Sequence, residues 1–162
     1  VATGGGPGAM EAANLGARAV AISPAALDDA VDELAAVPSF HGAIDDWIDS
    51  ARRVAGRVGE GVSLGIPTWH YGHEPPNSFA TAIAKYFQNS VREDILLRVA
   101  NAGLVVMPGG GGTVQEVFQD ACENSYAAEG AWAPLVLLGR QFWSVDMPAW
   151  PLLQAVMRGR PG

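Results

Sequence analysis

The residues best suited to chemistry lie in the stretch VVMPGGGGTVQE, which runs from Val105 to Glu116. A short apolar run ends at a proline, four glycines follow, and a threonine and a glutamate open a predicted helix. Glycines lack the β-carbon that would hold an anion away, and the start of a helix offers unpaired amides and a positive dipole end. The stretch therefore favours a bound phosphate, with a carboxylate one helical turn behind it.

A second glycine-rich turn, TGGGPGAME, occupies residues 3–11. In α/β folds, ligands bind beyond the carboxyl ends of the parallel strands, where both turns are predicted to lie. Neither turn matches GxGxxG in full and neither carries the lysine of a Walker A loop, which argues against a hydride-transfer dehydrogenase and a P-loop NTPase. One such turn could merely let a helix fold back on the sheet, but two at strand ends favour ligand binding.

Glu116 has two interpretations from its position alone. Thr113 and Glu116 have the spacing of a capping box, so the glutamate could simply bind a backbone amide at the helix start. Ser90 and Glu93 repeat this spacing, with Arg92 inside the second predicted helix. Position favours capping for Glu93 and leaves Glu116 open between capping and catalysis.

The alternation of apolar β-branched runs with helical patterns predicts an α/β fold, a Rossmann-like doubly wound parallel sheet that forms a single domain over residues 1–162. A glycine turn needs a full strand in front of it, and so the first elements of the domain are expected before Val1. Ser23 and Pro24 give one helix a clear start. Predicted strands cover 61–67, 82–87 (a helix being the alternative), 103–107 and 134–139, with a possible strand at 18–23, and predicted helices cover 10–19, 23–37, 45–58, 90–100, 113–126 and 150–157.

The composition, 49% hydrophobic and 17% charged, is that of a soluble globular protein, and no apolar run approaches the length of a membrane span, about 20 residues. The single cysteine excludes a disulfide framework and fits a cytoplasmic protein. The net charge of −7 and the lack of a basic stripe argue against nucleic-acid binding. Arg52, Arg53 and Arg57 are interpreted as a solvated helix face rather than a phosphate track.

The stretch WHYGHE offers a further candidate site. His70 and His73 lie three residues apart with Glu74 adjacent, but a metal site would need further ligands that the sequence does not supply. A lid over a base, with Trp69 or Tyr71 stacking on it, is more plausible. A packed loop is the plain alternative.

Other reactive or bulky residues have weaker claims. Lys85 could form a Schiff base with pyridoxal phosphate, but no supporting motif accompanies it. Cys122 is expected in the core. Trp132, Trp143 and Trp150 could pack in the core or at an interface.

The stretches GGGPGAMEAAN and PGGGGTVQE together resemble the LOG family, whose members were long mislabelled lysine decarboxylases. The family's pattern is GGGxxGxM-like early in the domain and PGGxGTxxE later. The resemblance implies hydrolysis of the N-glycosidic bond of a nucleoside 5′-monophosphate, AMP or a modified adenine nucleotide being favoured, to free base and ribose 5-phosphate. It implies no metal or organic cofactor, and a homodimer. The alternative is a non-catalytic carrier of a nucleotide or molybdenum cofactor on the same fold.

The resemblance also assigns site residues. The family typically has Arg-Lys where this chain has Arg92 and Glu93, a departure that bears on substrate preference. Such cleavage passes through an oxocarbenium-like state. A carboxylate can stabilise this state or activate the water that attacks it, and an arginine can offset charge on the leaving base. With one carboxylate placed, the stereochemical course stays open. The implied catalytic residues are Arg92 and Glu116, and the implied phosphate- or nucleotide-binding residues are Gly5, Gly6, Gly8, Met10, Gly109, Gly110, Gly111, Gly112 and Thr113.

Overall fold

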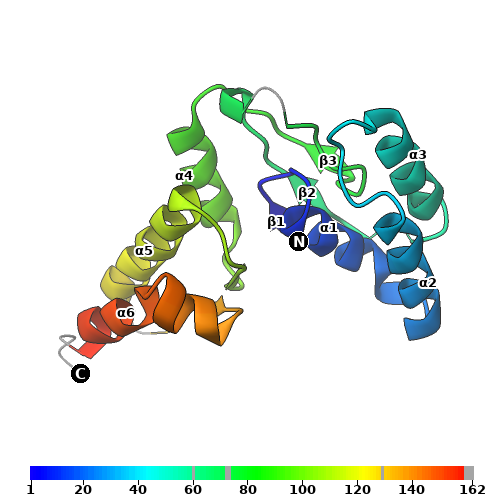
Figure 1. Cartoon of the computed structure of the whole chain (residues 1–162). Helices are drawn as coiled ribbons and strands as arrows, with labels where there is room; N and C mark the ends of the chain where they lie inside the picture. Colours follow the sequence, from blue (N-terminus) through cyan, green and yellow to red (C-terminus); the bar gives the residue numbers. More distant parts are fainter. Residues whose placement is uncertain (60, 72–73, 129, 159–162) are drawn as a thin grey trace. The chain divides into compact units, whose positions relative to one another are not determined.

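The computed structural model describes residues 1–59, 61–71, 74–128 and 130–158, without the side chain of Tyr71. The chain divides into two compact units, Val1–Leu96 and Leu97–Gly162 (Figure 1). Each unit contains parallel strands connected through helices, so the α/β class predicted from the sequence is confirmed. That both units form one domain stays a prediction.

Unit 1 is built on three short parallel strands in the order β1–β2–β3. Thr3 pairs with Gly65, which pairs in turn with Ile83, so the carboxyl ends of the three strands lie at one edge of the sheet. Leu15, Val54 and Phe79 belong to a core formed mainly by the helices that follow β1. The elements are β1 (Ala2–Thr3), α1 (Ala9–Arg18), η1 (Ala19–Ala21), α2 (Pro24–Ala35), α3 (Ile44–Ala55), β2 (Leu64–Gly65), η2 (Trp69–Tyr71), β3 (Ala82–Ile83) and the start of α4 (Asn89–Val99).

Unit 2 is built on two parallel strands, β4 and β5, which α5 and α6 accompany. Alternate strand residues point to opposite faces. Val106 of β4 is buried, whereas Val105 is 63% exposed. The second core includes Val117 of α5 and Trp143, whose indole Nε1 donates to the carbonyl of Leu138 over 2.9 Å. The elements are β4 (Leu104–Val106), α5 (Gly111–Tyr126), β5 (Leu135–Leu137), η3 (Phe142–Asp146) and α6 (Ala149–Arg158).

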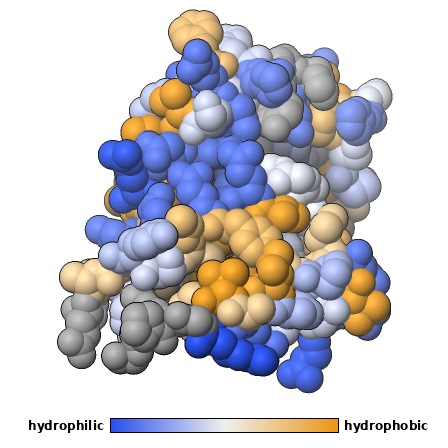
Figure 2. Space-filling view, turned by 90° about the vertical axis from the view of Figure 1, so that its left-hand side faces the viewer, coloured by the Kyte–Doolittle hydropathy of each residue, from blue (hydrophilic) through white to orange (hydrophobic). Residues whose placement is uncertain are grey.

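The surface carries a substantial apolar component. Figure 2 shows one face on which apolar side chains gather in the lower half. The exposed large apolar residues of α6 include Trp150, Leu152 and Val156. Within the part of the chain that the structure describes, every helix is too short or too polar to cross a membrane.

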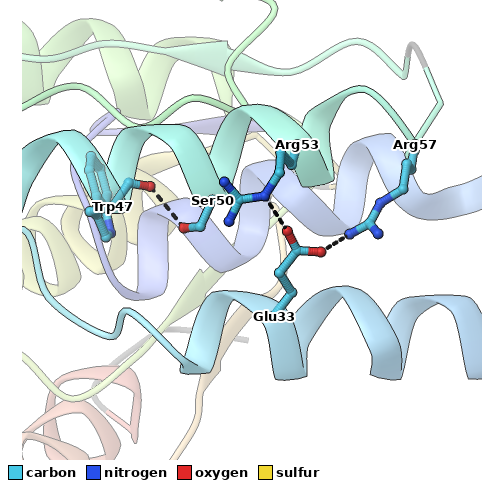
Figure 3. Close-up of polar contacts among 5 residues, drawn as sticks. All are labelled: Glu33, Trp47, Ser50, Arg53 and Arg57. Carbon is cyan, nitrogen blue, oxygen red and sulfur yellow. Dashed lines mark hydrogen bonds and ion pairs between the residues drawn. The ribbon is translucent and has the colours of Figure 1, made fainter.

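The arginines of α3 and the residues after it form ion pairs across two neighbouring helices. Figure 3 shows Glu33 of α2 accepting from both Arg53 and Arg57, with 2.8 Å between Arg53 Nε and Glu33 Oε1. The hydrogen bond from Arg53, followed by that from Arg57, lowers the pKa of Glu33. Arg52 lies 3.6 Å from Asp49, and both are exposed. These pairs agree with the predicted solvated face.

Several local predictions are wrong. Residues 18–23 contain the 3-10 helix η1 instead of a strand. Cys122 is exposed, because the neighbouring Ala121 and Val117 occupy the core-facing side of α5. Ser23 caps α2 as predicted, accepting from the amide of Ala26 over 3.2 Å.

Candidate functional site

The residue at the N-cap of α5 is a glycine, which has no side chain that could cap the helix. Gly110 is the N-cap, in extended conformation, and makes no side-chain cap hydrogen bond. Its carbonyl accepts the first helical bond from Val114 over 3.1 Å, and no acidic residue occupies the first turn. The amides and the positive dipole end of this helix are therefore suited to an anion from outside the chain.

The glycines around this helix start differ in what requires them. A β-carbon on Gly109 would clash with the side chain of Thr113, its Cβ being 2.9 Å away, so the packing itself demands glycine there. A β-carbon on Gly110 or Gly111 would meet nothing within 4 Å. Neither of these two has a positive φ. Among the described residues, neither a contact nor the backbone conformation requires glycine at these two positions, and a closely approaching ligand would be one reason for it.

Glu116 is not part of a capping box. Because α5 begins at Gly111, Thr113 is the third helical residue and Glu116 the sixth, beyond the first turn. Residues four apart share a helix face, and side chains lean toward the N-terminus. Half-buried Glu116 therefore lies on the same face of α5 as Gly112, whereas Val117 lies on the core-facing side.

The first glycine turn differs from the second in its charge. Glu11, in the first turn of α1, accepts from the amide of Gly8 over 3.4 Å. Burial raises the pKa of Glu11, an effect that the hydrogen bond from Gly8 opposes. A carboxyl group of the chain thus already occupies the start of α1. A phosphate would meet it there, so this turn is better suited to an uncharged part of a ligand.

Met10 and Arg92 pack against the first glycine turn. A β-carbon on Gly4 would lie 2.7 Å from Met10 Sδ and 3.3 Å from Arg92 Nη1. Gly5 and Gly8 have φ values of 75° and 73°, in the region that favours glycine. Glycine is therefore required in this turn both by conformation and by close approach.

The structure corrects the second predicted capping box as well. Helix α4 begins at Asn89, so Ser90 is inside it and is not the N-cap. Glu93 is 1% exposed, accepts from Asn89 Nδ2 and lies 3.6 Å from Arg92 Nη2. Arg92 Nη2 in turn donates to Asn89 Oδ1 over 2.7 Å. Glu93 and Asn89 therefore orient Arg92. The spacing of Asn89, three residues before Arg92 and four before Glu93, could have suggested these contacts.

Each unit groups some of the predicted site residues. Unit 1 brings Arg92 and Met10 to the turn that contains Gly5, Gly6 and Gly8. Unit 2 places Glu116 on the helix that the second turn opens. The catalytic and binding roles of all these residues stay predictions.

Comparison with known proteins identifies the family. A profile of the family described as possible lysine decarboxylase matches residues 48–150, which include Arg92, both predicted capping boxes and the PGGGGT turn. The chain belongs to this family. It is the LOG family that the two glycine motifs resemble, and membership supports a role of the nucleotide-phosphoribohydrolase type. A search of curated proteins gives no significant match.

Decarboxylase chemistry, which the older description of the LOG family suggests, finds no support in the placement of the lysine. Lys85 Nζ lies 3.6 Å from the centroid of the Trp69 ring, which also stacks on Phe87. The indole that was predicted as a lid thus already has two partners. His73 and the side chain of Tyr71 lie outside the described residues, among which no group of three potential metal ligands occurs.

Asp120, one turn beyond Glu116, gives a prediction on stability. Burial, and then the charge of Glu123, raises the pKa of Asp120. The raised pKa means that ionised Asp120 opposes folding, and that this penalty disappears as the pH falls below the ordinary aspartate value, about 3.9. Asp120→Asn, which can still accept from Asn124, should therefore stabilise the protein by a few tenths of a kcal/mol at pH 7 after solvent screening. Thermal melts should show a higher melting temperature for Asp120→Asn than for the wild type at pH 7, and no difference near pH 3.5. A lower melting temperature of the variant at pH 7 would contradict the prediction.

Proposed function

We propose that the protein hydrolyses the N-glycosidic bond of a nucleoside 5′-monophosphate and releases a free base and ribose 5-phosphate. The observation that carries this proposal is the start of α5: no contact of the described residues requires glycine at Gly110 and Gly111, and Glu116 lies on the same helix five residues after Gly111. Family membership supports the same class of reaction.

The spacing on α5 suits a ribose phosphate. The axial rise from Gly111 to Glu116 is roughly 7–8 Å at 1.5 Å per residue. A phosphate at the helix start would leave its sugar within reach of the Glu116 carboxylate. That carboxylate would stabilise the oxocarbenium-like sugar or activate the attacking water.

The family resemblance assigns nucleotide binding to the first glycine turn and catalysis to Arg92, both of which lie in unit 1. The carboxyl group of Glu11 disfavours a phosphate at this turn, so the turn would bind ribose hydroxyls or the base. Arg92, held by Asn89, would offset negative charge as the base departs.

The experiment is a direct assay of base release. The purified protein is incubated with a panel of nucleoside monophosphates and, as controls, the matching nucleosides, and free base is separated and quantified. Release from monophosphates and little from nucleosides is expected. A protein that binds a monophosphate but releases no base would instead be the non-catalytic nucleotide or cofactor carrier.

Arg92→Ala should raise KM and lower kcat, with kcat/KM falling by about tenfold or more, because one charge-assisted interaction is worth about 1.5–3 kcal/mol. The change also leaves Glu93, 1% exposed, without its nearby guanidinium, so the melting temperature should fall. Arg92→Lys is the matched control, since lysine keeps the positive charge but lacks the planar guanidinium with its paired donors. Wild-type kcat/KM in folded Arg92→Ala would remove Arg92 from the reaction.

Assembly as a homodimer, through the helices around 89–101 and 113–126, is part of the proposal. The apolar residues exposed on α6 and the area in Figure 2 are compatible with association but do not identify a partner. Light scattering at micromolar concentration should give at least twice the chain mass, and a monomer mass would contradict the dimer.

A further inference from the structure

A buried polar network supports the first glycine turn. Asn14 Oδ1 accepts from Thr3 Oγ1 over 2.7 Å and from Asn77 Nδ2 over 2.9 Å, and Asn14 Nδ2 donates to Ser63 Oγ over 2.6 Å. The four residues are between 0% and 8% exposed. Buried polar groups that satisfy one another rigidify their surroundings, and here the surroundings include the turn.

Asn77 is the member of this network that binds the turn directly. Its backbone amide donates to the carbonyl of Gly5 and its Nδ2 donates to the carbonyl of Gly6, both over 2.9 Å. Its Oδ1 accepts from the amides of Phe79 and Ala80 over 3.0 and 3.2 Å. Through its backbone amide and its side chain, Asn77 thus connects two consecutive glycine carbonyls to the loop that follows.

These bonds fix the orientation of the peptide groups. In a trans peptide the C=O and the following N–H point in opposite directions. Since the Gly5 carbonyl points to Asn77, the N–H of Gly6 points away from Asn77. A β-carbon on Gly5 would lie 3.0 Å from Pro67 Cδ, so the turn has little room to adopt another shape.

We propose that Asn77 is a positioning residue, which holds Gly5 and Gly6 in the shape in which the turn binds the nucleoside part of the substrate. The guanidinium of Arg92, from α4, packs against the preceding Gly4 of the same turn. This inference rests on the proposed hydrolysis of nucleoside monophosphates.

The test compares Asn77→Asp and Asn77→Ser with Ser63→Ala. Both Asn77 variants keep an oxygen for the amides of Phe79 and Ala80 and lose the donor to Gly6. Ser63→Ala is the matched control, because it removes a bond from the same network without touching the turn. Kinetics are measured with the best monophosphate of the panel, at a temperature where circular dichroism shows each variant folded.

The Asn77 variants should show KM raised about tenfold and kcat within about threefold, since contacts made in both ground and transition state affect KM. Ser63→Ala should keep the wild-type KM. A partly unfolded sample would lower apparent kcat and leave KM alone, so a purely structural role would not raise KM. The inhibition constant of inorganic phosphate should stay unchanged in all three variants, because Asn77 serves the nucleoside part.

Four results would overturn the inference: a wild-type KM in the folded Asn77 variants, an equal KM rise in Ser63→Ala, a phosphate inhibition constant that rises with KM, or failure of both Asn77 variants to fold. Any of these, with an active wild-type protein, leaves the proposed function intact. If the wild-type protein releases no base from any monophosphate, the proposed function itself fails and this inference fails with it.

Discussion

Glu116→Gln should lower the turnover of a nucleoside monophosphate by roughly 10²-fold or more, because it removes the negative charge that stabilises the developing cation in the proposed mechanism. The melting temperature should barely change. Glu116 is half-buried, lies on the face of α5 away from the core residue Val117, and is too far along the helix to cap it. Glutamine keeps the size of the side chain and can still accept a hydrogen bond, so the free energy of unfolding should change by less than about 1 kcal/mol.

The control for this variant is Glu123→Gln, the same substitution on the same helix. Glu123 is exposed and lies in the second half of α5, two turns from Glu116. Its neutralisation should leave turnover at the wild-type level. Wild-type turnover in Glu116→Gln would show that the catalytic assignment is wrong, whereas unchanged nucleotide binding together with lost turnover would separate chemistry from binding.

The elements that the sequence predicts well are those with strong local signals. Ser23 and Pro24 define the start of α2 because a cap and a fixed φ act within one turn of chain. The start of α5 is misplaced because Thr113 is a better cap by type than Gly110, yet the glycines before it already have helical geometry. The predicted strand at 18–23 fails because its β-branched residues follow directly from α1 and are few.

In the candidate site, too, the features with a local sequence signal could be predicted and those that depend on distant contacts could not. Residue type and spacing predict both glycine turns, since bare backbone before a helix is visible in sequence. Which glycine the packing requires depends on Thr113 lying over Gly109, which is a matter of side-chain geometry. The hydrogen bond between Asn14 and Asn77 spans 63 positions, and nothing local marks either asparagine as buried.

Substitutions in the second glycine turn should separate binding from folding. Gly111→Ala should stabilise the protein by about 0.5–1 kcal/mol, because Gly111 is helical and its added methyl meets nothing within 4 Å. The same methyl should weaken the binding of a nucleoside monophosphate by about tenfold or more, since displacing one charge-assisted hydrogen bond costs about 1.5–3 kcal/mol. The affinity measured by calorimetry should therefore fall while the melting temperature rises. Gly110→Val should weaken binding further without unfolding the protein.

Two glycine controls make this result specific to phosphate. Gly16→Ala, within α1, also places its methyl in open space and should stabilise the protein while leaving nucleotide affinity unchanged. Gly109→Ala should destabilise the protein by about 1–3 kcal/mol, because its methyl clashes with Thr113. Binding of the matching nucleoside, which has no phosphate, should be insensitive to Gly111→Ala. If Gly111→Ala stabilises the protein and the monophosphate still binds with wild-type affinity, the start of α5 does not hold the phosphate, and the bareness of Gly110 and Gly111 needs another cause.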